Sequence, residues 1–364
     1  MNKQQAETLI KTTFENAFDE DQYLRFLREL FNGQIDESDD RKFDYYGQYI
    51  PDSFKDSVRR YKRLGTYTDP DGNEIDLLIV ILKRDGSLDR ARTMQRNFAA
   101  YHLKRREKET AIIAYTTEER GDWRFSMVRR EPVVAFSEKG NLIAKDELTP
   151  VRRYSFLVGK SERSHTAQQQ LFPILLDDKH DPTLDGLEEA FNIETVTKEF
   201  FERYKALFLQ LKEELDRLTT KDRRVQAEFE AKELDTANFA KKLLGQIVFL
   251  YFLQKKGWLG VREGDNWGTG PKDFLRQLFD LKWRSYDNFF NDVLEPLFYE
   301  ALAEDRKDKD NIYPRLNARI PFLNGGLFEP MGNYDWKGTD ILIDNGVFES
   351  IFTTFDLYNF TVRE

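Results

Sequence analysis

The spacing of hydrophobic residues predicts a chain that opens with helices and then turns to short strands. In residues 4–32 the apolar side chains fall mostly three or four positions apart, which is typical of one or two amphipathic helices, and Asn32-Gly33 supplies a stop. A helix is also predicted over 88–104, between the second and third strands. The runs with the character of β-strands are 57–67, 75–83, 110–117, 123–130 and 152–158.

Turn and loop signals mark the connections within this α/β module. The segment Asp69-Pro70-Asp71-Gly72-Asn73 predicts a tight turn that joins the first two strands into a hairpin, because proline fixes φ and glycine accepts a positive φ. Charge, proline and glycine cluster at 177–186, which indicates a boundary. We therefore expect a first domain over 1–176.

The chain beyond this boundary is predicted to be mainly helical. Four segments carry a helical pattern: 187–218, 224–256, 271–281 and 287–303. Residues 239–256 are apolar almost all round, which indicates a helix buried between its neighbours, and Gly257 provides its cap. The sequence thus predicts an α+β or α/β N-terminal domain, with helix, β-hairpin, helix and strands in that order, followed by a mainly α-helical domain.

Composition narrows the class of protein. The 364 residues are 40% hydrophobic and include 30 Phe and 16 Tyr, which is enough to build cores in two or three domains. Cysteine is absent, which excludes thiol catalysis, and the three histidines are too far apart in sequence to indicate a histidine metal site. The sequence shows neither a signal peptide nor an apolar run of ~20 residues, so we expect a cytoplasmic protein without a membrane partner.

The stretch 74–83 carries the most informative candidate chemistry. A strand that begins with Glu74 and Asp76 and ends in Lys83 leads into a helix, which is the arrangement of the PD-(D/E)xK nucleases. In such a site two carboxylates hold a divalent cation that polarises a phosphodiester, and the lysine stabilises charge on the attacking water or the phosphate. The candidate catalytic residues are therefore Asp76, Lys83 and Glu74, with Asp76 and Glu74 as ligands of Mg²⁺.

The alternation of side chains along a strand weighs against this assignment. Glu74 and Asp76 share one face, whereas Lys83, seven residues after Asp76, belongs to the other face unless a β-bulge intervenes. Ile81 occupies the position two before the lysine, where the acid of the usual pair would lie. In the alternative interpretation, Asp76 ends a turn and Lys83 is a solvated strand terminus.

Basic residues concentrate in residues 84–108, although the whole chain carries a formal net charge of −9. This stretch contains eight Lys/Arg and three Asp/Glu. Arg92, Gln95 and Arg96 lie about one helical turn apart, which predicts contacts with DNA phosphates. A solvated helix surface is the alternative.

The chain resembles the N-terminal part of type IIG restriction–modification enzymes, in which a nuclease and an adenine-specific DNA methyltransferase share one polypeptide. The resemblance is carried by RARTMQRNF at 90–98, FAKKLLGQIVFLYFLQKKGWLGV at 239–261 and IPFLNGGLFEP at 320–330. It implies a PD-(D/E)xK nuclease-like domain over 1–176 and a helical connector domain over 185–315. It also implies that 316–364 is the start of a truncated methyltransferase domain.

The resemblance implies partners and cofactors as well. Double-stranded DNA would be the substrate, and its phosphodiesters would be cleaved with Mg²⁺. The glycine-rich turn that would hold S-adenosylmethionine and the Asn-Pro-Pro-aromatic motif that would receive a flipped adenine are missing from this chain. We therefore expect the chain to be a fragment, with the adenine-N6 methyltransferase and target-recognition domains, and the S-adenosylmethionine site, in a C-terminal part of the same polypeptide.

Within this hypothesis each candidate residue has a role. Asp76 with Glu74 would bind the metal, and Lys83 would stabilise the pentacovalent phosphate. The arginines and Gln95 of the basic helix would hold the DNA backbone or position water. The alternative is a non-catalytic DNA-binding or scaffolding module with a decayed nuclease core, which Ile81 favours. A third possibility is an unrelated α/β–helical interaction protein.

Overall fold

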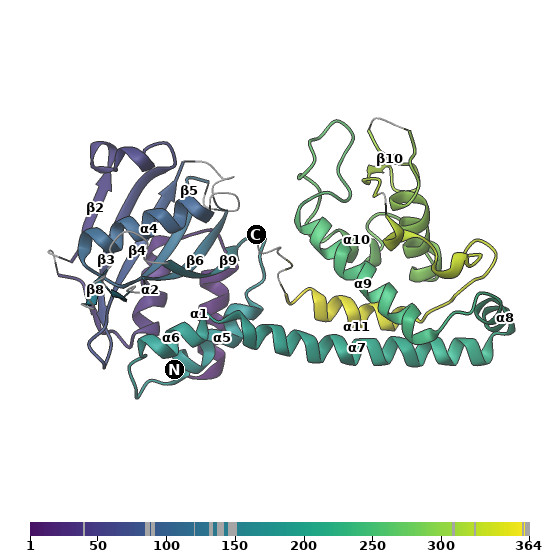
Figure 1. Cartoon of the computed structure of the whole chain (residues 1–364), viewed down its shortest axis with the longest axis horizontal. Helices are drawn as coiled ribbons and strands as arrows, with labels where there is room; N and C mark the ends of the chain where they lie inside the picture. The colour runs from purple at the N-terminus through teal and green to yellow at the C-terminus, as the bar shows by residue number, and fades with distance from the viewer. Residues whose placement is uncertain are drawn as a thin grey trace. The chain divides into compact units, whose positions relative to one another are not determined.

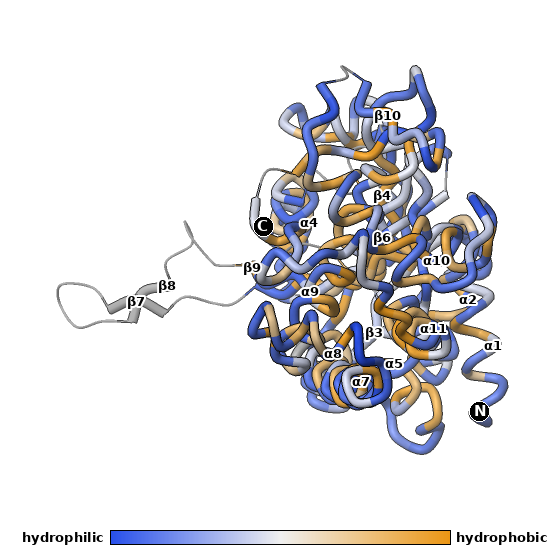
Figure 2. The backbone as a smooth tube through the Cα atoms, turned by 90° about the vertical axis from the view of Figure 1, so that its right-hand side faces the viewer, coloured by the Kyte–Doolittle hydropathy of each residue, from blue (hydrophilic) through white to orange (hydrophobic). Residues whose placement is uncertain are grey.

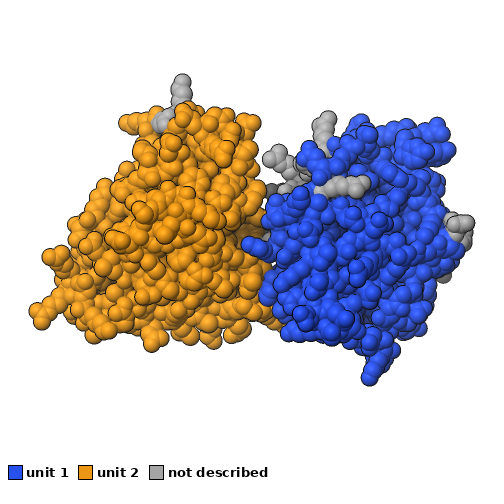
Figure 3. Space-filling view, turned by 180° about the vertical axis from the view of Figure 1, so that it is seen from behind, with its two compact units in different colours: residues 1–196 blue, residues 197–364 orange. Residues whose placement is uncertain are grey.

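The chain divides into two compact units, Met1–Val196 and Thr197–Glu364 (Figure 3). This computed structural model describes all residues except 39–40, 84–87, 89–91, 120, 131–133, 137–141, 145–150, 308–309, 324, 359 and 361–364. Hydrophobic residues, orange in Figure 2, lie mainly inside the units, whereas hydrophilic residues, blue, are frequent on loops and outer helix faces. The residues that the structure does not describe include parts of the basic stretch 84–108 and of the block 90–98.

Unit 1 is built on a seven-stranded mixed sheet (Figure 1). The strand order is β1-β3-β4-β5-β6-β9, and β2 also pairs with β3. Strands β4 and β5 are parallel, whereas the other pairs of this sheet are antiparallel. The strands are β1 (Ile35–Asp36), β2 (Phe43–Tyr46), β3 (Val58–Thr68), β4 (Glu74–Leu82), β5 (Thr110–Thr117), β6 (Asp122–Arg130) and β9 (Val151–Gly159). A separate hairpin joins β7 (Val134–Phe136) to β8 (Leu142–Ala144).

Helices cover both faces of this sheet (Figure 1). One face packs against α1 (Lys3–Phe14), α2 (Glu20–Leu30), α5 (His165–Leu176) and α6 (Leu184–Ala190). The other face packs against α4 (Arg92–Arg106), with the short 3₁₀ helices η1 (Gly47–Tyr49) and η2 (Asp52–Phe54) in the segment before β3. The two cores are separated by the sheet, because alternate residues of each strand point to opposite faces. Trp123 is buried in the first core and Phe98 in the second.

The elements predicted for the N-terminal part are confirmed. Each of the five predicted runs coincides with a strand to within one residue at either end, and α4 occupies the predicted helix between β4 and β5. The turn between β3 and β4 has the predicted chemistry: the Asp69 carboxylate accepts hydrogen bonds from the backbone N–H groups of Asp71 and Asn73. Gly72 adopts φ of +86° there, as the turn requires. This part of the chain is therefore a mixed α/β unit.

Unit 2 is mainly helical and contains one large hydrophobic core. Its helices are α7 (Ile193–Lys221), which begins within unit 1, α8 (Arg223–Ala231), α9 (Thr236–Lys255), α10 (Phe274–Phe279) and α11 (Asn345–Phe355). The predicted helix over 287–303 is present but consists largely of wider π turns. These turns are η3 (Phe290–Leu294) and η4 (Leu297–Leu302); the remaining short elements are β10 (Ile312–Tyr313), β11 (Ala318–Arg319), η5 (Gly326–Phe328) and η6 (Met331–Asn333).

Helix α9 is the buried helix that the sequence predicts. Leu244, Ile247 and Leu250 are fully buried among side chains from the surrounding elements. Gly257 follows the end of the helix with φ of +68°, which confirms its role as the cap.

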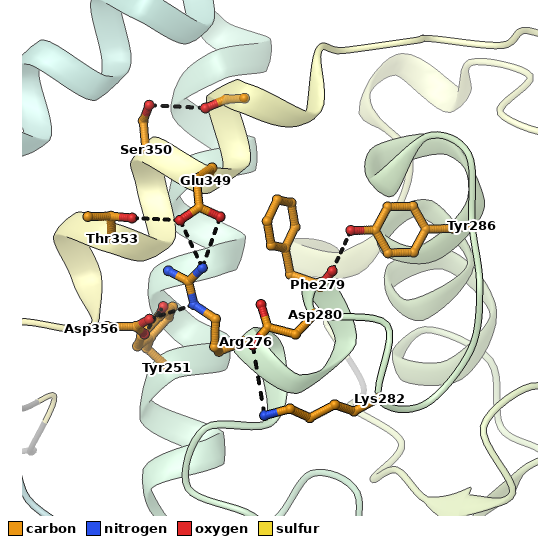
Figure 4. Close-up of polar contacts among 11 residues, drawn as sticks. Tyr251, Arg276, Phe279, Asp280, Lys282, Tyr286, Glu349, Ser350, Thr353 and Asp356 are labelled. Carbon is orange, nitrogen blue, oxygen red and sulfur yellow. Dashed lines mark hydrogen bonds and ion pairs between the residues drawn. The ribbon is translucent and has the colours of Figure 1, made fainter.

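A polar cluster fixes α10 against α9 and α11 (Figure 4). Arg276 donates from Nε to Asp356 at 2.8 Å and from Nη1 to both oxygens of Glu349, at 3.1 and 3.0 Å. The Tyr251 hydroxyl donates to the same Asp356 at 2.6 Å. Burial lowers the pKa of Arg276, but the two carboxylates more than offset that effect and hold it above the usual value. The cluster therefore contributes a charged contact at the edge of an otherwise apolar core.

The predicted helix over 224–256 is interrupted, which the sequence pattern did not indicate. Glu233 adopts a left-handed backbone conformation with φ of +51°. Asp235 then caps α9 by accepting hydrogen bonds from the backbone N–H groups of Ala237 and Asn238. The left-handed residue ends one helix and the capping carboxylate begins the next. In the same way, the predicted segment 187–218 spans the end of α6 and most of α7.

The compact units have different bounds from the predicted domains. Residues 184–190 form α6, whose apolar side chains lie in the core of unit 1. Residues beyond 316 share one core with α7, α9 and α10. The functional identities assigned to 1–176, 185–315 and 316–364 stay predictions.

The cap at Gly257 provides a test of the packing in unit 2. A Cβ at this position would lie 2.3 Å from the carbonyl oxygen of Gly268. We expect Gly257→Ala to lower the unfolding free energy by more than the roughly 1–2 kcal/mol that the left-handed conformation alone costs. Gly264→Ala is the matched control, since Gly264 has φ of +82° with open space around it. Equal losses in the two variants, measured by urea unfolding, would contradict this packing.

Candidate functional site

Asp76 lies at the centre of a buried polar network between β3, β4 and α4. Its side chain is fully buried. One carboxylate oxygen, Oδ1, accepts a hydrogen bond from Arg63 Nη2 at 2.5 Å, and the other, Oδ2, is 2.8 Å from His102 Nε2. Arg63 Nη2 also donates to the Thr66 hydroxyl at 2.7 Å. Both oxygens of Asp76 are thus held by side chains of the same unit.

The topology of the sheet brings these three residues together. Thr66 pairs with Asp76 across the β3–β4 hairpin, and a bulge between Arg63 and Gly65 alters the register just before it. Helix α4 connects the parallel strands β4 and β5, so its C-terminal end returns to the end of the sheet where β4 begins. His102, near that end of α4, therefore meets Asp76, near the start of β4.

The charges in this network follow from burial and hydrogen bonding. Burial raises the pKa of Asp76, but the hydrogen bonds from His102 and Arg63 outweigh that effect and leave its pKa below the usual value. Burial lowers the pKa of His102, and the contact with Asp76 offsets only part of that shift. At neutral pH the network consists of a charged Asp76–Arg63 pair and a neutral His102 that donates its Nε2–H, because a carboxylate only accepts.

Lys83 is not close to Asp76 in this structure. It follows the last residue of β4, is exposed, and uses its backbone N–H to donate to the Ser57 carbonyl oxygen at 2.9 Å. The pairing of β4 with β5 is regular from Ile75 to Leu82, so no bulge in β4 changes the parity. At about 3.3 Å per residue, seven residues place the two backbones roughly 23 Å apart. One phosphate does not bridge that distance.

Glu74 is engaged at the start of β4. Its side chain is half-buried, forms a close ion pair with Lys108 and lies 3.5 Å from Arg41 Nη2. No group of three or more Asp, Glu, His or Cys side chains in the described part of the chain has the geometry of a metal site. Because cations already hold the carboxylates of Glu74 and Asp76, the described residues do not fit the Mg²⁺ site predicted there.

The three residues predicted to contact DNA differ in their exposure to solvent. Arg96 is exposed and Arg92 is half-buried at the start of α4. Gln95 lies in the interior, donates to the Leu88 carbonyl oxygen at 3.1 Å and accepts from Arg153 at 2.6 Å. The structure therefore presents the two arginines, but not Gln95, toward solvent, and DNA binding by any of them stays a prediction.

Two members of the network were not singled out in the sequence. Arg63 and His102 precede and follow Asp76 by 13 and 26 positions. A signal for His102 does exist, because Gln95, Phe98, Ala99, His102 and Leu103 form an i, i+3, i+4, i+7, i+8 stripe, which is the buried face of α4. Arg63 carries no comparable signal, since arginine in a strand is usually exposed.

Comparison with known proteins yields one partial similarity. A stretch of 135 residues is 30% identical to a protein of Methanocaldococcus jannaschii whose name is "Putative type II restriction enzyme and methyltransferase RM.MjaORFECS2P". The stretch covers 36% of this chain and 10% of that protein. No protein-family model and no solved structure matches the chain. The chain is thus related in part to a restriction–modification protein.

Among the described residues, none of the helices combines the length and the apolar character that crossing a bilayer requires.

The buried ion pair predicts a stability effect at Asp76. Asp76→Ala leaves the Arg63 guanidinium buried without its counter-charge, so we expect the unfolding free energy to fall by about 3–5 kcal/mol. Glu74→Ala on the same strand removes a partly exposed ion pair, and we expect at most about 1 kcal/mol. Urea unfolding, monitored by hydrogen exchange of the β4 amides, measures the loss of unfolding free energy in both variants. Similar small losses in both variants would show that the Asp76–Arg63 pair contributes little.

The lowered pKa of His102 predicts a pH dependence. An unfolded histidine takes up its proton near 6.5, whereas folded His102 does so only at lower pH. Stability is therefore fully present above about pH 6.5 and is lost as the pH falls below it, by at most about 1.4 kcal/mol per pH unit. In His102→Gln, which keeps an N–H donor, we expect the loss between pH 7 and 5 to shrink. An unchanged pH profile would contradict the assignment.

Proposed function

We propose that this chain is the DNA-binding part of a restriction–modification protein. The partial similarity to a restriction enzyme and methyltransferase supports the biological context. The observation that carries the proposal is the charge of α4, which has five Lys/Arg and no Asp/Glu over Arg92–Arg106 in a chain of net charge −9. A helix of one charge sign on an acidic protein is the electrostatic footprint of a phosphate backbone.

The packing of α4 places several of its basic side chains on the solvent side of the helix. The stripe that includes Phe98 and Leu103 is buried against the sheet, whereas Arg96, Lys104 and Arg105 are exposed. Arg105 lies over the Tyr45 ring at 5.7 Å and Arg106 over the Phe43 ring at 4.2 Å. These cation–π contacts hold the guanidinium groups at the C-terminal end of the helix in place without neutralising them.

DNA cleavage at Glu74, Asp76 and Lys83 is not part of this proposal. Asp76 supplies the counter-charge of Arg63, Lys83 lies at the far end of β4, and Glu74 is paired with Lys108. This arrangement supports the DNA-binding alternative to the nuclease hypothesis. Mg²⁺ as a cofactor, and a methyltransferase with its S-adenosylmethionine elsewhere in the same polypeptide, stay predictions.

The salt dependence of DNA binding tests the proposal. Each phosphate contact made by Lys or Arg contributes about 0.9 to the slope of log K against log salt. We expect the chain to bind duplex DNA, measured by fluorescence anisotropy, and Arg92→Ala/Arg96→Ala to reduce the slope by roughly 1 to 2 units.

A second arginine pair provides the control for charge alone. Arg223 and Arg224 are adjacent and exposed at the start of α8. Replacing both by alanine removes the same charge, and we expect the wild-type slope to persist. If both double variants change the slope equally, or the wild-type chain shows no binding at low salt, the proposed function is wrong.

A further inference from the structure

Arginines from β6, β9 and α4 gather on the α4 face of the sheet. In the antiparallel β6–β9 pair, Arg124 lies opposite Leu157, Ser126 opposite Ser155, and Val128 opposite Arg153. Val128 packs in the core beneath α4, so Arg124 and Arg153, which share its face by alternation, also point to the α4 side. The first turns of α4 contribute Arg92 and Arg96.

Arg153 and Arg124 each donate to neutral acceptors. Arg153 Nη1 donates to Gln95 Oε1 at 2.6 Å. Arg124 is almost fully buried and donates from Nε to the Leu88 carbonyl oxygen at 2.7 Å and from Nη1 to the Ser155 hydroxyl at 3.3 Å. In the part of the chain that the structure describes, no carboxylate lies within ion-pair distance of Arg92, Arg96 or Arg153. Among the described residues, these three guanidinium groups therefore have no counter-ion.

The electrostatics of Arg153 show that this arrangement is unfavourable by itself. Burial first, and then the neighbouring Arg124, Arg92 and Arg96, lower the pKa of Arg153 to about 10. Two buried polar atoms nearby, Arg92 Nε and Ser126 Oγ, have no hydrogen-bond partner among the described residues. Buried charges and buried donors are normally paired, and a cluster of like charges around unused donors is relieved by an anion.

We propose that Arg92, Arg96 and Arg153 bind one phosphate group, and that Gln95 is a positioning residue that orients Arg153 for it. Planar guanidinium forks match the oxygens of a phosphate, which accepts several charge-assisted hydrogen bonds at once. Arg153 and Arg92 are partly exposed and Arg96 is exposed, so the anion has access from solvent. The inference rests on the proposed function in taking a phosphodiester of the DNA backbone as the source of that phosphate.

Thermal unfolding of the whole chain with inorganic phosphate tests the site directly. A ligand that binds the folded state raises the melting temperature, and chloride at matched ionic strength corrects for screening. We expect phosphate to stabilise the wild-type chain, and Arg153→Gln to need roughly 10- to 100-fold more phosphate for the same shift. Arg152→Gln is the control, because Arg152 precedes Arg153 on β9 but faces the opposite side, near Glu188.

Two further measurements separate a phosphate site from a merely structural arginine. Without phosphate, Arg153→Gln removes a repelled charge, so we expect its melting temperature to equal or exceed that of the wild type; a structural role would lower it. Gln95→Glu places a carboxylate where Arg153 already finds its acceptor. We expect this variant to be more stable without phosphate and to lose most of the phosphate response. If Arg153→Gln and Gln95→Glu respond to phosphate as the wild type does, the inference is overturned.

DNA binding by the same variants distinguishes the source of the phosphate from failure of the proposed function. If the DNA backbone supplies the phosphate, Arg153→Gln reduces the slope of log K against log salt by about one unit, and inorganic phosphate competes with DNA. A phosphate-stabilised chain that binds no DNA would retain the phosphate site, assign it to a free phosphate or nucleotide, and remove the DNA-binding function. A chain that binds DNA with the predicted slopes but gains no stability from phosphate would retain the function and eliminate this site.

Discussion

The buried ion pair between Asp76 and Arg63 determines how the sheet and α4 of unit 1 fit together. Both side chains are withdrawn from water, and removing a charge from water costs several kcal/mol unless a partner compensates. Compensation here requires Arg63 on β3, Asp76 on β4 and His102 on α4 to keep their positions simultaneously. The hairpin register, the bulge beside Gly65 and the return path of α4 are therefore linked through one carboxylate.

The pairing of Asp76 with Arg63 also affects the other charged residues on the same face of the sheet. Asp76 is in register with Ala111, Ala111 with Val128, and Val128 with Arg153, so that Asp76 and Arg153 lie in one row across the sheet. With neighbouring strands about 4.8 Å apart, three steps separate their backbones by roughly 14 Å. Neither the carboxylate nor its charge is available to the arginines at the β9 edge, because Arg63 and His102 surround it. Asp76 therefore does not balance the positive charge at that edge.

The sequence predicted the elements of unit 1 well because each depends on local chemistry. Short apolar runs bounded by turn residues mark strands such as β4, and the Asp69–Asn73 turn requires only the residues within it. The interruption at Glu233 was missed because a non-glycine residue in the left-handed conformation leaves no sequence mark. Where local signals suffice, sequence-based predictions agree with the structure.

The candidate site was harder to predict because it depends on contacts between distant residues. The sequence pattern singled out Asp76 and Lys83 from their order along one strand. An extended strand keeps its two ends far apart, so these two side chains do not meet. Arg63 and His102 reach Asp76 only through the hairpin and the helix crossover. Gln95 was predicted to contact DNA together with Arg92 and Arg96, whereas its spacing to Phe98 and His102 places it on the buried stripe.

Asp76 and Glu295, two acidic residues that are fully buried, show how a neighbouring cation decides whether a buried carboxyl group is charged. Glu295, between η3 and η4 in unit 2, accepts one hydrogen bond from the Tyr334 hydroxyl, at 2.5 Å, and burial raises its pKa to about 9. Its carboxyl group is neutral at physiological pH because burial raises its pKa and, in the described part of the chain, no cation pairs with it. Asp76 is charged because Arg63 pairs with it. A carboxyl group without a cationic partner can take up a proton and become neutral.

A guanidinium does not have the same alternative. Even a pKa lowered to about 10 leaves Arg153 protonated at neutral pH, so its charge persists despite burial and despite the cations around it. Loss of a proton therefore does not neutralise Arg153 at neutral pH, and balancing its charge requires a counter-ion. In the proposed phosphate site Gln95 holds Arg153, and no carboxylate among the described residues pairs with it, so a bound anion would supply the missing counter-charge.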